Sequence, residues 1–260
     1  MKSLVMVVAL VLVSSSAFGG MVGYWRFEEG SGVTTADDSG TGNTGHLVKD
    51  TALTPPLWQD DTPPIYGGNH SLYFPAGASV TAYDNPTLDI TGSLSIHVYV
   101  KPESLVGNRP FVGKWSSDDS FLFRFDGTLA FSLAATGSGS STDTLFYTPA
   151  PGELPLNEWT HLAAIYNHGT REMSMYINGV KKASQISWVH EIRSTNANVQ
   201  IGQYENSHYA GWIDEVKIFD GIYIPDPPDS GDLPGGPVPE PAALSLVGIG
   251  LTIICKRRRL

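Results

Sequence analysis

Short apolar stretches alternate with polar residues along most of the chain, and Gly, Pro, Asn or Ser residues separate them. No stretch keeps the i, i+3, i+4 apolar spacing of an amphipathic helix for long. Runs of this length and spacing predict an all-β protein, built as a sandwich or barrel. The predicted strands cover residues 22–27, 70–74, 93–100, 109–114, 120–125, 128–134, 143–147, 159–167, 172–177, 181–185, 198–202 and 211–219.

Turn residues predict how neighbouring strands connect. Asp126-Gly127 and Asn178-Gly179 each lie between two apolar runs, and such residue pairs tolerate the positive φ angles of two-residue hairpins. His168-Gly169 predicts a third turn. Because hairpins join antiparallel strands, this pattern argues against a parallel α/β sheet.

The stretch Gly211–Phe219 contains one residue that its pattern does not explain. Its alternation places Trp212, Asp214, Val216 and Ile218 on one face of a strand, so a carboxylate lies among apolar side chains. A bare carboxylate in a low-dielectric interior costs on the order of several kcal/mol. Asp214 is therefore expected to be protonated, paired or bound to a cation.

The first 19 residues have the pattern of a secretory signal peptide, and the protein is therefore predicted to be exported. Lys2 precedes the apolar run 4–13, and the small residues Ala17 and Gly19 stand at the −3 and −1 positions of a cleavage site. This assigns residues 1–19 to the signal peptide.

The C-terminal residues predict a second targeting signal after a Pro- and Gly-rich linker at 225–237. The apolar run 242–255 is shorter than the roughly 17–25 residues of a membrane span. The basic cluster that follows acts as a stop-transfer signal, so transient membrane insertion is expected. The residues of this signal are Val238, Pro239, Glu240, Pro241, Arg257, Arg258 and Arg259.

Residues 238–260 resemble the PEP-CTERM sorting signals of Gram-negative bacteria. The resemblance rests on the Pro-Glu-Pro motif, the apolar segment and the arginine cluster, in that order. It implies an inner-membrane intermediate, an exosortase partner that removes the tail, and a final location at the cell surface or in the extracellular matrix. A permanent single-pass anchor is the alternative.

Charge and cysteine content agree with export. The chain carries a formal net charge of −10, which disfavours binding to nucleic acid or anionic lipid and suits divalent cations. Its one cysteine, Cys255, lies in the apolar tail. The segment 20–224 therefore has no disulfide, and its stability must come from a core and any bound metal.

Residues 20–224 are predicted to form one domain that resembles the LamG-like, or concanavalin A-like, jelly-roll family. The family implies a sandwich of two curved antiparallel sheets in which the first and last strands are neighbours. The segments that carry the resemblance are 23–32, 38–45, 94–102, 158–163, 175–179 and 211–219.

Members of this family often hold a structural Ca²⁺ near the joined termini. The resemblance implies Asp38, Asp214 and Glu28 as ligands, because Ca²⁺ prefers carboxylate and carbonyl oxygens. An arrangement without metal is the alternative, in which Asp214 accepts hydrogen bonds from backbone N–H groups of loop 38–45 or pairs with Arg26.

No arrangement of residues predicts catalysis. Glycoside hydrolases need two carboxyl groups across a cleft, whereas the consecutive Asp214 and Glu215 point to opposite faces of a strand. The histidines lack zinc-site spacing, and neither a phosphate-binding loop nor a Gly-x-Ser-x-Gly motif occurs. The sequence therefore predicts that the protein is not an enzyme.

Aromatic residues in the loops are the candidate ligand-binding groups, since exposed rings stack on sugars. They are Trp58, Trp115, Trp188, Tyr204 and Tyr209, whereas Trp25, Trp159 and Trp212 are expected in the core. Each loop ring could instead cover the sandwich edge. The prediction is an exported binding or adhesion module for a carbohydrate or protein. The alternatives are a structural surface protein without a discrete ligand and a divergent glycoside hydrolase.

Overall fold

The computed structural model describes residues 20–49, 54–64, 67–116, 119–137 and 141–225. The predicted signal peptide and sorting tail, and all of the linker after Pro225, lie outside these residues. Within the described part, no helix is long and apolar enough to cross a membrane.

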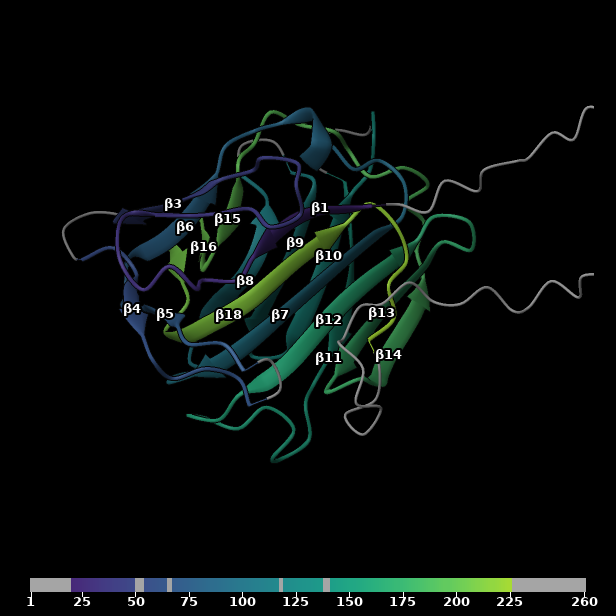
Figure 1. Cartoon of the computed structure of the whole chain (residues 1–260). Helices are drawn as coiled ribbons and strands as arrows, with labels where there is room; N and C mark the ends of the chain where they lie inside the picture. The colour runs from purple at the N-terminus through teal and green to yellow at the C-terminus, as the bar shows by residue number, and fades with distance from the viewer. Residues whose placement is uncertain (1–19, 50–53, 65–66, 117–118, 138–140, 226–260) are drawn as a thin grey trace, which may run out of the picture.

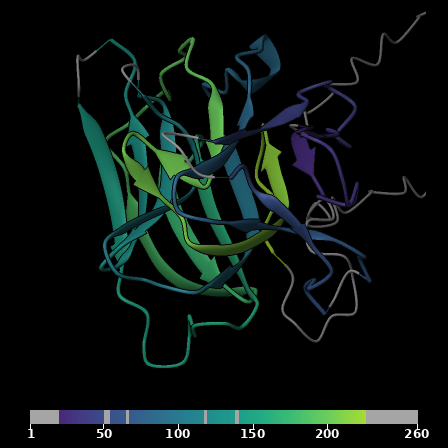
Figure 2. The same cartoon turned by 90° about the vertical axis from the view of Figure 1, so that its left-hand side faces the viewer.

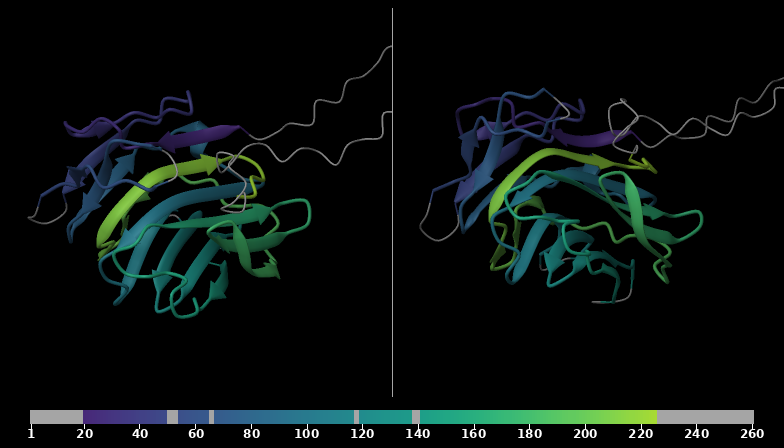
Figure 3. Two further views of the ribbon diagram at one scale, coloured as in Figure 1. Left: turned by 60° about the horizontal axis from the view of Figure 1, so that its bottom comes forward. Right: turned by 90° about the horizontal axis from the view of Figure 1, so that it is seen from below.

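The described residues form two eight-stranded antiparallel sheets that stack face to face (Figure 1), which confirms the all-β prediction. Figure 3 shows one sheet arching over the other, and Figure 2 shows the domain from the side. We call the two sheets A and B. In order, sheet A contains β14 (Val180–Ile186), β13 (Glu172–Ile177), β12 (Thr160–Asn167), β7 (Leu94–Pro102), β18 (Gly211–Phe219), β5 (Ser71–Phe74) and β4 (Leu57–Gln59), with β1 (Met21–Trp25) paired to β18.

Sheet B and a small hairpin complete the domain. In order, sheet B contains β11 (Thr142–Tyr147), β10 (Leu129–Ala134), β9 (Phe121–Asp126), β8 (Asn108–Lys114), β15 (Val199–Ile201), β6 (Ala78–Ala82), β3 (Gly45–Lys49) and β2 (Thr34–Thr35). The short strands β16 (Gln203–Tyr204) and β17 (Ser207–His208) pair with each other, and one 3₁₀ turn, η1, covers Pro86–Leu88.

The predicted hairpins are confirmed. Residues 127–128 connect β9, which ends at Asp126, to β10, and residues 178–179 connect β13 to β14. Asn178 and Gly179 both have positive φ angles, 47° and 74°, as a two-residue hairpin requires. The first and last strands are neighbours as well, with Tyr24 opposite Lys217 in the pairing of β1 with β18.

A continuous apolar core fills the space between the two sheets. Phe111 packs edge-on against Phe123, with ring centroids 5.4 Å apart. Trp25 is fully buried as predicted, and its indole N–H donates to the carbonyl of Asn43 (2.8 Å). The largest of these core side chains is therefore buried with its one polar atom hydrogen-bonded.

The predicted alternation of β18 is wrong after Asp214, because a β-bulge interrupts the strand there. The pairing of β18 with β7 shifts register between Asp214 and Lys217, and Glu215 adopts a φ angle of 52°. Ile213 and Val216, three positions apart, both lie in the core. Asp214 therefore does not share a face with Val216, because the bulge inserts an extra residue between them.

Candidate binding site

Two of the five aromatic residues predicted to bind ligand are buried, so the prediction of exposed rings is wrong for them. Tyr209 has no exposed surface, and its ring packs against Phe111 at a centroid distance of 5.8 Å. Trp115 is only 8% exposed and clusters with Leu122 and Ala134. Turn residues flank both positions, but the rings fold back onto the sheets.

The other three predicted rings lie apart from one another. Trp58 is half-buried, and its indole N–H donates to the carbonyl of Gly32 (3.0 Å). Tyr204 is half-buried and packs against the cluster around Trp115. Trp188 is 47% exposed. The five residues therefore do not form one site, and Trp188 alone presents a largely open ring.

Two tryptophans expected in the core are instead half-buried beside charged groups. The indole N–H of Trp159 donates to a carboxylate oxygen of Asp61 (2.8 Å). The ammonium group of Lys101 lies 5.0 Å from the centre of the Trp212 ring and pairs with Asp61. Both rings are thus held in a charged network at the surface of sheet A.

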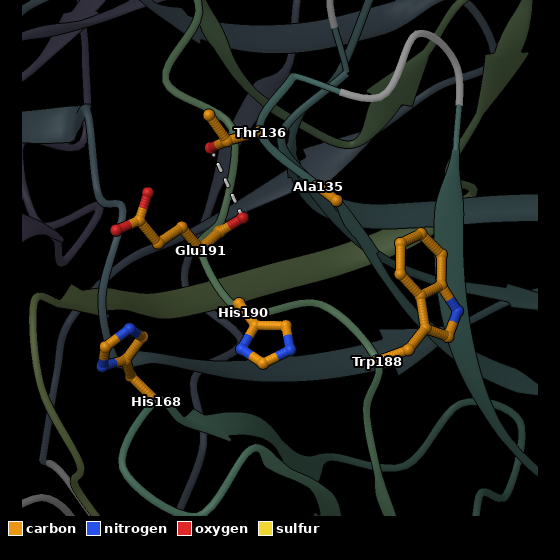
Figure 4. Close-up of a pocket in the computed structure, with 6 residues that line it drawn as sticks. All are labelled: Ala135, Thr136, His168, Trp188, His190 and Glu191. Carbon is orange, nitrogen blue, oxygen red and sulfur yellow. Dashed lines mark hydrogen bonds between the residues drawn. The ribbon is translucent and has the colours of Figure 1, made fainter.

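Trp188 lines a cavity of about 520 Å³ at the edge of the sandwich. Figure 4 shows the imidazoles of His168 and His190 and the carboxylate of Glu191 grouped toward one side, with the indole of Trp188 on the other. Thr136 and Ala135, which directly follow β10, complete the lining. His168 lies in the turn between β12 and β13, so both sheets contribute to the cavity.

Two buried side chains anchor the loop 187–193 that carries Trp188. Val189 and Ile192 are fully buried in the core, whereas the residues on either side of Val189 are exposed. The hydroxyl of Tyr166 donates to the carbonyl of Val189 (2.6 Å), and the backbone N–H of Thr136 donates to that of Glu191 (3.2 Å). The loop backbone is therefore fixed before any ligand arrives.

Asp143 holds the beginning of this loop. Its carboxylate accepts hydrogen bonds from the hydroxyl of Ser187 (2.7 Å), the backbone N–H of Trp188 (3.2 Å) and the amide of Gln185 (3.2 Å). A ring whose backbone is already ordered loses little conformational entropy when it binds. The indole of Trp188 is thus a preorganised surface for stacking.

The sequence analysis missed His168, His190 and Glu191 as site residues. A weak local signal does exist, because the apolar Val189 and Ile192 stand among the polar residues 190, 191 and 193. The contact that turns this segment into a cavity wall comes from Thr136, however, which follows β10 and lies 55 residues earlier in the chain. No spacing rule within the segment could supply that contact.

The carboxylates predicted to bind Ca²⁺ do not form a ligand set. Among the described residues, no group of three or more His, Cys, Asp or Glu side chains is placed to hold a metal ion. Asp38 lies 4.0 Å from the guanidinium of Arg26, and Glu28 accepts a hydrogen bond from the backbone of Asn69 (2.9 Å). The three predicted ligands, Asp38, Asp214 and Glu28, are therefore not placed to hold one ion together.

The expected metal-free partners of Asp214 are also different in the structure. Asp214 accepts a hydrogen bond from the backbone N–H of Glu215 (2.8 Å), not from loop 38–45. The guanidinium of Arg26 lies 3.5 Å from the carboxylate of Glu215 instead. The exchange occurs at the bulge, where the register shift between Asp214 and Lys217 changes which carboxylate lies beside Arg26.

Asp37 organises the loop next to β1. Its carboxylate accepts hydrogen bonds from the backbone N–H groups of Tyr24 (2.9 Å), Ser39 (3.0 Å) and Asn43 (2.8 Å) and from the hydroxyl of Thr41 (2.9 Å). Burial alone would raise the pKa of Asp37, but these hydrogen bonds outweigh it and lower the pKa. Hydrogen-bond donors of the protein thus occupy the Asp37 carboxylate oxygens that could otherwise bind a cation.

Comparisons with solved structures support the fold. Domain 4 of AbnA, a GH43 extracellular arabinanase from Geobacillus stearothermophilus solved with arabinotriose, is 19% identical, with a TM-score of 0.59 over 78% of this chain and 94% of that one. The binding domain of Paraclostridial Mosquitocidal Protein 1 is 14% identical, with a TM-score of 0.60 over 78% of this chain and 49% of that one.

A third similar structure is the binding domain of botulinum neurotoxin DC in complex with SialylT. It is 14% identical, with a TM-score of 0.57 over 78% of this chain and 48% of that one. The chain thus spans about half of each toxin binding domain. No curated protein matches it significantly by sequence. Residues 74–223, more than half of the chain, match the family described as the concanavalin A-like lectin/glucanases superfamily. The chain belongs to this superfamily.

Proposed function

We propose that the protein is an exported, non-catalytic binding module that holds a carbohydrate in the cavity beside Trp188. The observation that carries this proposal is a 47% exposed indole on an anchored loop, next to polar side chains that line the same cavity. Similar folds solved in complex with arabinotriose and with SialylT support a glycan as the ligand class.

The lining supplies both kinds of contact that sugars need. The apolar face of a pyranose or furanose ring stacks on an indole, and its hydroxyls bond to polar side chains. His168 and His190 offer ring nitrogens as donors or acceptors, and Glu191 offers carboxylate oxygens as acceptors. The cavity volume of about 520 Å³ suits one or two sugar units.

The arrangement of carboxylates around the cavity favours binding of a glycan over its hydrolysis. Glycosidases place two carboxyl groups across the bond they cleave, roughly 5–9.5 Å apart. Among the described residues that line the cavity, Glu191 supplies the sole carboxylate. The nearby Asp143 carboxylate is occupied by three donors of its own loop region. This cavity therefore supports recognition of a glycan without its cleavage.

Substitution of Trp188 by alanine should weaken glycan binding about tenfold or more, since loss of stacking and buried ring area removes roughly 1.5 kcal/mol. A glycan array would identify a ligand, and titration of that ligand would give the affinities. Tyr83→Ala is the matched control, because Tyr83 is 59% exposed and follows β6 on the far side of sheet B. An array without binding would instead favour a structural surface protein.

We also propose secretion and processing by an exosortase, on the basis of residues 1–19 and 238–260 alone. Mass spectrometry of protein recovered outside the cell should show a chain that begins near Gly20 and lacks the basic tail. Recovery of the intact C-terminus from membranes would favour the permanent anchor instead.

A further inference from the structure

We infer that the glycan bound beside Trp188 is anionic and carries carboxylate groups, as uronic acids do. This inference rests on the proposed carbohydrate site and specifies its ligand. It comes from the charged groups around the cavity, where the acidic excess of the chain as a whole is absent.

The chain is acidic, with 26 Asp and Glu residues against 16 Lys and Arg residues. Among the described residues, the lining contains two histidines, which are neutral or cationic and never negative, and a single carboxylate, Glu191. Two arginines, Arg171 and Arg193, hydrogen-bond to lining residues. An acidic protein thus gathers cationic groups around one cavity, which favours a ligand of negative charge.

Arg171 both orients a lining histidine and adds charge. Its terminal nitrogen lies 3.3 Å from Nε2 of His190. A guanidinium can only donate, so Nε2 accepts and the proton of neutral His190 stays on Nδ1. The backbone carbonyl of Arg171 accepts from the N–H of Ser187 (2.7 Å), which fixes the arginine to the loop of Trp188. His190 is thereby held as an N–H donor.

Arg193 lies at the other end of the same loop. Its backbone N–H donates to the carbonyl of Ala134 (2.9 Å), and its Nε donates to that of Ala135 (3.2 Å). These bonds do not use the terminal nitrogens of the guanidinium, the part of the fork that binds carboxylates most directly. The side chain is therefore anchored by one edge, beside a residue that lines the cavity.

The two nearby acidic residues, Asp143 and Glu191, differ in how strongly they oppose the positive charge of the two arginines. Asp143 directs its two oxygens to Ser187, Trp188 and Gln185, within the base of the loop. Glu191 does line the cavity, so it would repel an anionic ligand while accepting bonds from sugar hydroxyls. Arg171 and Glu191 should accordingly change the preference for anionic ligands in opposite directions.

Polygalacturonate and its fully methyl-esterified form test the inference, because the two polymers differ in charge but share one sugar backbone. The secreted protein should bind polygalacturonate at least tenfold more tightly than the esterified polymer at low salt. Arg171→Gln should lower the ratio of the two affinities, and Glu191→Gln should raise it. Lys49→Gln, an exposed cation on β3 across sheet B, should leave the ratio unchanged.

The outcomes separate this inference from the proposed site. Equal binding of the two polymers, or no binding to any carboxylated glycan on an array, would overturn the anionic ligand. Charge-selective binding that persists in Trp188→Ala would overturn the site itself. A thermal melting curve for each variant shows that a changed ratio does not come from unfolding.

Discussion

Replacing Lys114 with methionine is expected to destabilise the domain by about 3 kcal/mol. The Lys114 side chain is fully buried, and its ammonium group lies 2.6 Å from Asp84 and 2.7 Å from Asp89. Methionine has a similar length, so the loss comes mainly from two carboxylates left without their cation. Their side chains are 31% and 26% exposed, so water screens part of the repulsion and the lower end of the usual range applies.

This ion cluster also ties two parts of the fold together. Asp84 and Asp89 stand on either side of η1, whereas Lys114 ends β8 in sheet B. Urea unfolding would measure the loss, with Lys49→Met as the control for an exposed lysine of the same sheet. Adding Asp84→Asn and Asp89→Asn to Lys114→Met should restore much of the stability. Unchanged stability of the single variant would show that the cluster contributes nothing.

The sequence predicted the parts of the fold that depend on local chemistry. Asn178-Gly179 sets its own hairpin, and strong apolar runs such as residues 159–167 form central strands. The strands β3 and β6 were missed because they are built from small or polar residues with few large apolar side chains. Their burial between other strands, not their own propensity, makes them extended.

The candidate site was predictable only in part. Trp188 was recognised as a loop aromatic, but its partners depend on contacts between distant segments. Asp143 holds the loop across 45 positions of sequence separation. The bulge at Glu215 is a similar case, because it is defined by the register of β18 against β7. A period of two along one strand cannot reveal where its partner forces an extra residue.

Burial dominates the expected behaviour of Asp214, the carboxylate that first marked β18 as unusual. Asp214 is only 1% exposed, and the nearby cations Arg26 and Lys217 pair with Glu215. Arg26 lies 3.5 Å and Lys217 3.4 Å from that neighbouring carboxylate, which also accepts a hydrogen bond from Tyr24 (2.5 Å). Burial, with repulsion from Glu215, raises the pKa of Asp214 to about 9.

Asp214→Asn is therefore expected to become more stable relative to the native protein as pH rises. Between about pH 4 and pH 9, the folded protein keeps a proton on Asp214 that the unfolded chain releases, so native stability falls with pH by up to about 1.4 kcal/mol per unit. Asparagine resembles the protonated acid and removes this dependence. The stability difference between variant and native protein should grow by about 1 kcal/mol per unit from pH 5 to pH 8.

Urea unfolding at several pH values would measure that difference, and Asp126→Asn, at an exposed hairpin position, is the control that should show a flat difference. The comparison cancels other groups, including His97, whose pKa burial lowers to about 4 and which therefore adds stability as pH rises toward neutrality. A flat difference for Asp214→Asn would mean that the carboxylate is ionised in the fold. That result would restore a cation beside Asp214, either Arg26 or a bound metal, in place of the proton that the bulged geometry favours.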